Sequence, residues 1–446
     1  MRRASGLILS SLLGVLPALA QYTDPTAFQE CGGAAEFAAR REGLRKQVGT
    51  GLILLFARVT LPEAAHYVED NDFFYYTGLK EPGAVLAMDA ASGRTVLFQP
   101  PHSARELQVL GKTLLAQDAE TRKGYGFPLV LPIEDLDTFL LRALPGPLWM
   151  RLGFPDKTDG ARLETAMDQA RHHNHPFGVR EFPATAPIQR MREHYPGAEL
   201  KDLTAFIDAQ RNLKTPAEAQ LLRRTGHLGA EGLKRAMAKA KPGMWQYQVE
   251  AEAAYVFAMG GAEGWAYPAI VGSGKDANTW HYFSNRARIE ADELVVFDFS
   301  PQLHQMTMDI TRTFNISGKF TPEQAKWYQV DLDAQKAVIA LLKVGNTYEQ
   351  AAEAGRKVFE KAGIGHQWMG FPGHFLGLAT HDVGRCTGPI RKGQVMTVEP
   401  IIEFPEQHLH FRVEDTMLVT DGEPEILSAG VPKELAEVEK LVGSQK

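Results

Sequence analysis

The sequence predicts an α/β domain followed by an α+β domain in which one helix-helix-sheet unit occurs twice. In the first part, short apolar segments suited to strands, such as 52–56, alternate with helical stretches. A charged stretch rich in Pro and Ala, 183–196, marks the boundary between the domains. Beyond it, residues 215–314 and 321–420 share one order of helix starts, breaks and β-like runs. We therefore predict an internal pseudo-two-fold duplication in the second domain.

The first domain is predicted over residues 25–195. β-like segments at 52–56, at 72–76 and on both sides of the turn at 91–94 give it an α/β pattern. Three histidines cluster within 171–175, but no carboxylate or cysteine lies beside them at the spacing of metal ligands. A solvated loop is therefore predicted there, and not a metal site.

The second domain, predicted over 205–446, begins each half with the same helix signals. Thr215-Pro216-Ala217-Glu218 and Thr321-Pro322-Glu323-Gln324 each offer an N-cap threonine and a proline at the first helical position. The side chain three residues after the threonine can cap the helix in return. Two related halves that face one another would form a cleft between their sheets, which is a common place for a ligand.

The composition of the 446 residues is that of an ordinary globular protein. Hydrophobic residues make up 44 %, charged residues 23 %, and the mean hydropathy is -0.23, which excludes a membrane bundle, a coiled coil and a disordered chain. The formal net charge of -6 gives the chain no overall attraction to phosphate backbones, so no nucleic-acid partner is expected. The two cysteines, Cys31 and Cys386, form no disulfide framework.

The first twenty residues have the pattern of a secretory signal peptide. A basic start, Met1-Arg2-Arg3, precedes an apolar run at 7–19 and a small-x-small site at Ala18-Leu19-Ala20. The apolar run is too short to cross a bilayer, so no stable membrane insertion is expected. We predict cleavage near Ala20 and a periplasmic or secreted product, with the export route left open.

A set of acidic residues and one histidine recurs across both halves of the second domain. Asp298 ends a buried-type strand and Asp309 begins a second β-like run, while the other half supplies His374, Glu399 and Glu414. Each acid alone is explained by a salt bridge or a helix cap. Buried together they need a cation, and an oxygen-rich set favours Mn²⁺, with Zn²⁺, Co²⁺ and Fe²⁺ left open. The set indicates two divalent metal ions that share a hydroxide, as in two-metal aminopeptidases.

An ordered series of motifs runs through the second domain: Val271-Gly272-Ser273-Gly274, Trp280-His281-Tyr282, Asp298, Asp309-Ile310-Thr311-Arg312-Thr313-Phe314, His374, His381-Asp382-Val383-Gly384, Thr397-Val398-Glu399-Pro400 and Arg412-Val413-Glu414-Asp415. By their order, the chain from Asn212 to Ser428 resembles the pita-bread metallopeptidases, most closely the aminopeptidase P and prolidase group. Upstream, Asn71–Gly78 and Glu81–Leu86 resemble the N-terminal domain of aminopeptidase P. The resemblance implies a creatinase/aminopeptidase-like (pita-bread) fold for the second domain.

The resemblance also implies the metal ligands. Asp298 would chelate one ion, Asp309 and Glu414 would bridge both ions, and His374 with Glu399 would complete the other. The catalytic residues follow from the same motifs.

Glu399 would take the proton of the nucleophile and return it to the leaving nitrogen. His281 and His381 would position the substrate and stabilise charge in the tetrahedral intermediate. Arg412 would orient a carboxylate.

The implied activity is that of an Xaa-Pro aminopeptidase, which removes the N-terminal residue from peptides with proline in second position. The alternatives are an Xaa-Pro dipeptidase (prolidase) and, from another class, a non-catalytic pita-bread peptide-binding protein. The resemblance further implies a homo-oligomer, either a dimer or a tetramer. The departures from the family pattern affect the substrate pocket and spare the ligands; they are Leu303, Gln305, Met306, Gly370 and Ile401.

Overall fold

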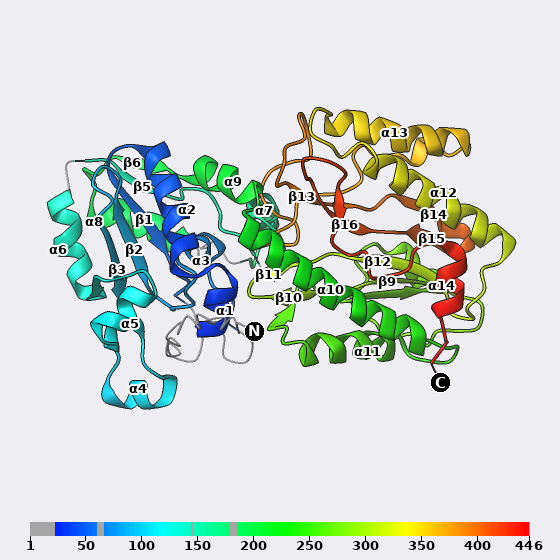
Figure 1. Cartoon of the computed structure of the whole chain (residues 1–446), viewed down its shortest axis with the longest axis horizontal. Coiled ribbons are helices and arrows are strands. Elements are labelled where there is room, and N and C mark those ends of the chain that lie inside the picture. The colour runs from blue at the N-terminus through cyan, green and yellow to red at the C-terminus, as the bar shows by residue number, and fades with distance from the viewer. Residues whose placement is uncertain (1–22, 60–66, 144–145, 158, 179–184, 446) are drawn as a thin grey trace, which may run out of the picture.

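The computed structural model describes residues 23–59, 67–143, 146–157, 159–178 and 185–445, so the predicted signal peptide lies outside the described residues. Figure 1 shows two lobes side by side, each with its own sheet and its own covering helices. Within the described ranges, no helix combines the length and apolar character needed to span a membrane.

The N-terminal lobe is built on a six-stranded mixed sheet with the order β4-β3-β2-β1-β5-β6. β1, β2 and β3 form an antiparallel meander, and β4, β5 and β6 add in parallel at the edges. Because β6 pairs with β5, the sheet extends past residue 195, where the sequence analysis ends this domain. The strands are β1 (Leu52–Phe56), β2 (Val85–Asp89), β3 (Thr95–Gln99), β4 (Val130–Pro132), β5 (Leu148–Met150) and β6 (Leu200–Asp202).

Two predictions for this lobe are wrong in secondary structure. Residues 72–76 belong to helix α3, because Asp70 caps its start with its side chain and Gly78 ends it in the left-handed conformation. Residues 171–174 form the last turn of helix α7, although their side chains are exposed as expected. The helices of the lobe are α1 (Pro25–Glu30), α2 (Gly33–Val48), α3 (Asn71–Thr77), α4 (Ala104–Leu110), α5 (Ala119–Gly124), α6 (Leu136–Ala143), α7 (Arg162–Asn174), α8 (Ala186–His194) and α9 (Thr204–Asn212).

The C-terminal lobe confirms the duplicated α+β domain. Each half pairs two helices with a three-stranded sheet, in the orders β12-β9-β8 and β13-β16-β17. The predicted capping boxes are present at Thr215 and Thr321. The first half comprises α10 (Pro216–Lys239), α11 (Gln246–Met259), β8 (Ile270–Ser273), β9 (Leu294–Asp298) and β12 (Thr311–Asn315); the second comprises α12 (Pro322–Ile339), α13 (Tyr348–Lys361), β13 (Val395–Val398), β16 (Asp415–Leu418) and β17 (Glu425–Ile426).

The two halves meet between their sheets, and this junction positions the site. The Glu414 backbone N–H donates to the Thr311 carbonyl over 3.1 Å, so the chain entering β16 lies against the start of β12. The hairpin of β14 (Ile401–Phe404) and β15 (Leu409–Arg412) crosses the same region. The remaining elements are β7 (Gly264–Trp265), β10 (Pro301–Leu303), β11 (Met306–Thr307) and α14 (Leu435–Leu441), which lies at the C-terminal end in Figure 1.

Candidate metal centre

Three of the five predicted ligands converge on one point. The carboxylates of Asp309 and Glu414 and the imidazole of His374 each offer an atom, and these atoms lie within 4.8 Å of one another. The His374 Nε2 atom also lies 3.3 Å from Glu399 Oε1 and 3.5 Å from Asp309 Oδ2. Its Nδ1–H donates to the Phe375 carbonyl over 3.1 Å, which directs Nε2 at the carboxylates.

Asp298, the fourth carboxylate, lies at the wall of the same pocket. It ends β9, opposite Thr311 of β12. Its two oxygens accept from the Tyr267 hydroxyl and from Nη2 of Arg412, the latter over 2.7 Å. Arg412 therefore orients Asp298, and the Thr311 hydroxyl orients Glu414 by donating over 2.7 Å.

The buried site carries more negative charge than its own cationic groups neutralise. Burial, together with the neighbouring carboxylates, raises the pKa of Glu414 well above its usual range. Burial also raises the pKa of Asp298 to about 7, although Arg412 opposes the shift. For Glu399 burial acts in the same direction, but the hydrogen bond from His374 holds the pKa at about 2.

These residues fit divalent metal ions. Asp309 Oδ1 and Glu414 Oε1 are buried and have no hydrogen-bond partner among the described residues, which is costly for ionised carboxylates. A cation placed between them would satisfy both atoms and would relieve the repulsion that raises the pKa of Glu414. Carboxylates with one imidazole are suitable ligands for a hard or borderline divalent ion.

The two predicted histidines of the substrate pocket lie beside the ligand set. The His381 ring centroid is 4.1 Å from that of His374 and 6.4 Å from that of His281. His281 stacks on Phe283 at 5.8 Å. His281, His381 and Arg412 all line a cavity of about 440 Å³.

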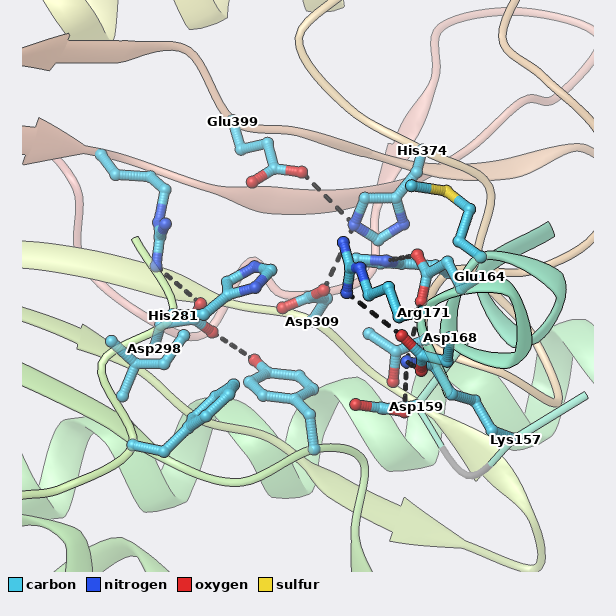
Figure 2. A pocket seen from close by; sticks show the side chains of 17 residues that line it. Lys157, Asp159, Glu164, Asp168, Arg171, His281, Asp298, Asp309, His374 and Glu399 are labelled. Atoms are coloured by element: carbon cyan, nitrogen blue, oxygen red, sulfur yellow. Dashed lines mark hydrogen bonds and ion pairs between the residues drawn. The ribbon is translucent and has the colours of Figure 1, made fainter. Parts of the chain in front are cut away.

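The N-terminal lobe supplies the opposite wall of this cavity. Figure 2 shows Glu164, Asp168 and Arg171 of α7, with Lys157 and Asp159 from the preceding loop, facing the side that carries Asp309 and His374. The Glu164 carboxylate contacts Nδ1 of His381. The site is thus built by both lobes.

Comparisons with known proteins agree with this architecture. The model of "Metallopeptidase family M24" matches residues 220–421, and that of "Aminopeptidase P, N-terminal domain" matches residues 37–147. Intermediate cleaving peptidase 55 of Schizosaccharomyces pombe is 30 % identical over 84 % of this chain and 79 % of its own length. Xaa-Pro aminopeptidase of Escherichia coli is 28 % identical over 91 % of this chain and 97 % of its own length. The chain belongs to the aminopeptidase P group of metallopeptidase family M24.

A solved structure supports the family at the level of the fold. The Pseudomonas aeruginosa aminopeptidase PepP superposes with a TM-score of 0.75 at 28 % identity, covering 92 % of this chain and 97 % of that chain. The predicted fold class is confirmed, and as an M24 aminopeptidase P the chain is a metallo-exopeptidase that uses divalent metal ions.

Some residues of this aminopeptidase P site escaped the sequence analysis. Tyr267 lies in no motif used there, although its place shortly before Val271–Gly274 was a usable signal. Glu164 had no sequence signal at all, because it reaches His381 from 217 positions away.

The departures from the family pattern lie outside the ligand set and are not among the residues that line the cavity. Gly370 has a φ of 102°, a left-handed conformation that a histidine would adopt only with strain. Gln305 is buried, and its Oε1 accepts from the Glu69 backbone N–H over 2.8 Å, so this side chain joins the two lobes.

Proposed function

We propose that the chain is an Xaa-Pro aminopeptidase, which hydrolyses the bond between an N-terminal residue and a following proline. The observation that carries the proposal is the convergence of Asp309, His374 and Glu414 within 4.8 Å at a cavity of about 440 Å³. The match to an aminopeptidase P N-terminal domain and the likeness to the Xaa-Pro aminopeptidase of Escherichia coli support the choice of substrate.

The proposed cofactor is a pair of divalent ions, with Mn²⁺ favoured because four of the five ligands are carboxylates. Asp298, Asp309, His374, Glu399 and Glu414 would hold them. When bound, such ions polarise a peptide carbonyl and make water nucleophilic at neutral pH.

The protein's own residues then have separate tasks in the reaction. Glu399 lies beside the other ligands, with Oε1 3.3 Å from Nε2 of His374, and its carboxylate can take a proton from the nucleophile and return it to the leaving nitrogen. His281 and His381 lie at the cavity wall, where their imidazoles can position the substrate and stabilise charge on the developing oxyanion. Arg412 and Tyr267 hold Asp298 by two hydrogen bonds, so this carboxylate does not have to reorganise during turnover.

The test is an assay of metal-reconstituted protein on three substrates: an Xaa-Pro dipeptide, a longer peptide that begins Xaa-Pro, and a matched peptide without proline. Cleavage of the longer Xaa-Pro peptide, at its first bond only, is the expected result. Cleavage limited to the dipeptide would make the enzyme a prolidase, and preference for the proline-free peptide would contradict both. The same assay with Zn²⁺, Co²⁺ or Fe²⁺ in place of Mn²⁺ ranks the ions.

We further propose that the enzyme is exported and forms a homo-oligomer, either a dimer or a tetramer. The signal-peptide pattern of residues 1–20 supports export. Mass spectrometry of the mature N-terminus would test cleavage after Ala20, and sedimentation of the purified enzyme would give its oligomeric state. An uncleaved N-terminus or a monomer would contradict the respective part.

A further inference from the structure

His381 is held by a segment of the other lobe. The Ala161 backbone N–H donates to the His381 carbonyl over 2.7 Å, and the His381 N–H donates to the Asp159 carbonyl over 3.1 Å. These bonds make a parallel β-bridge between Gly160 and His381. The backbone of this histidine is therefore fixed by the loop that leads into α7 of the N-terminal lobe.

The same segment also holds the imidazole. Nδ1 of His381 contacts Oε1 of Glu164, in the first turn of α7. An ionised carboxylate can only accept a hydrogen bond, so Nδ1 must carry a proton. Nε2 is then the nitrogen left for the cavity, which His381 lines next to His374 and His281.

Ion pairs anchor both sides of this contact. Arg162, two residues before Glu164, donates to Asp72 over 2.9 Å and to Asp208 over 2.8 Å. Asp382, next to His381, accepts from Arg211 over 2.6 Å, and Arg211 also binds Asp72 over 3.0 Å. Glu164 and His381 are thus fixed to one network, which limits their relative movement. A helix N-terminus is also a favourable place for the Glu164 carboxylate.

We propose that Glu164 is a positioning residue that fixes the tautomer and the orientation of His381, so that the N-terminal lobe completes the active site. The inference rests on the proposed function, because the orientation of His381 matters only when a peptide is bound and cleaved. Glu164 acts through His381 and need not touch the substrate.

The kinetic test uses a double-mutant cycle. Glu164→Ala should lower kcat about 10–100-fold, the usual cost of losing a residue that orients an active-site histidine, with little change in KM. Glu164→Gln should lower kcat less, because its amide oxygen can still accept a hydrogen bond from Nδ1–H of His381. In a His381→Gln background Glu164→Ala should cost nothing further. An equal loss in both backgrounds would overturn the proposal.

A second readout does not depend on activity. The measurement is an NMR spectrum of metal-free protein with ¹⁵N-labelled histidine, in which His381→Gln identifies the signals of His381. These signals should show a protonated Nδ1 in the wild type, and this signature should be lost in Glu164→Ala. Asp168→Asn is the matched control, since Asp168 lies on the same helix and cavity wall but bonds Lys157 and Arg171. An unchanged His381 spectrum in Glu164→Ala would overturn the proposal. The expected spectra from a protein inactive on every peptide would reject the proposed function and support the positioning role.

Discussion

Two buried clusters of carboxylates in this molecule differ in how their charge is compensated. Between the lobes, Arg211 lies 3.0 Å from Asp72, 2.7 Å from Asp156 and 2.6 Å from Asp382, and Arg162 and Lys214 add further positive charge. At the metal centre, the four carboxylates of the proposed ligand set meet one arginine, Arg412, and the imidazole of His374. The first cluster balances its own charge, whereas the second does not.

The difference separates a structural cluster from a metal site. Burial would raise the pKa of Asp382, but Arg211 and Lys214 keep it below its usual value, so the ionised form is the stable one. At Glu414 burial and the neighbouring acids both raise the pKa, and one oxygen lacks a partner among the described residues. Charge balance is therefore more informative than acid content when a metal site is sought.

The largest effect is expected from removal of a central ligand. Asp309→Ala should abolish turnover and metal content together, because the remaining groups cannot close the coordination sphere. Steady-state kinetics and elemental analysis of the same preparation check this. Asp333→Ala, which removes an exposed carboxylate of α12, is the control and should keep both. Full activity in Asp309→Ala would refute the assignment of Asp309 as a ligand.

The interlobe cluster consists of Asp72, Asp156 and Asp382 with Arg162, Arg211 and Lys214. A mutation in it should lower the free energy of unfolding and leave the metal content unchanged. Arg211→Met removes the guanidinium shared by the three buried carboxylates Asp72, Asp156 and Asp382, which costs about 3–5 kcal/mol of unfolding free energy. The matched control is Arg223→Met, which breaks the half-exposed pair with Glu425 and should cost only about 0–1 kcal/mol. Denaturant unfolding and elemental analysis measure both quantities. Loss of metal in Arg211→Met without loss of stability would reverse the roles given to the two clusters.

Local signals in the sequence predicted most of the fold. The capping boxes at Thr215 and Thr321 are each complete within four residues, and both are present. The aromatic run at 72–76 misled because every residue of α3 is buried, so no alternation or helical face distinguishes a helix from a strand. There the caps at Asp70 and Gly78 were the better signal.

Only those residues of the site that belong to sequence motifs could be predicted. The five proposed ligands lie in recognisable motifs of one domain and could be named from the sequence. Glu164 and the rest of α7 come from the other lobe, and only tertiary packing places them at the cavity. The contact of Gln305 with Glu69 likewise joins residues 236 positions apart.

Metal removal should affect the stability of the wild type but not that of Asp309→Ala. A ligand that binds only the folded protein stabilises it by about 2.7 kcal/mol at one hundred times its Kd. Adding Mn²⁺ to chelator-treated wild type should therefore raise Tm by several degrees, and Asp309→Ala should show no such rise. An equal rise in both proteins would place the stabilising ion elsewhere.

The smallest and sharpest effect is a pH trend of opposite sign with and without metal. The pKa of Asp298 rises from 3.8 to about 7 on folding of the metal-free protein, so this group stabilises the fold below pH 4 and loses that contribution as pH rises to about 7. Glu414 acts in the same direction. Asp382 has a lowered pKa, so it adds stability above pH 4, and its contribution does not change between pH 4 and 7.

The Tm of the metal-free protein should thus fall from pH 4 to 7, and Asp298→Asn should make this fall smaller. Bound Mn²⁺ should reverse it, because the ligands must be deprotonated to bind. A metal-free Tm that rises over this range would mean that the cavity, like the interlobe cluster, compensates its own charge.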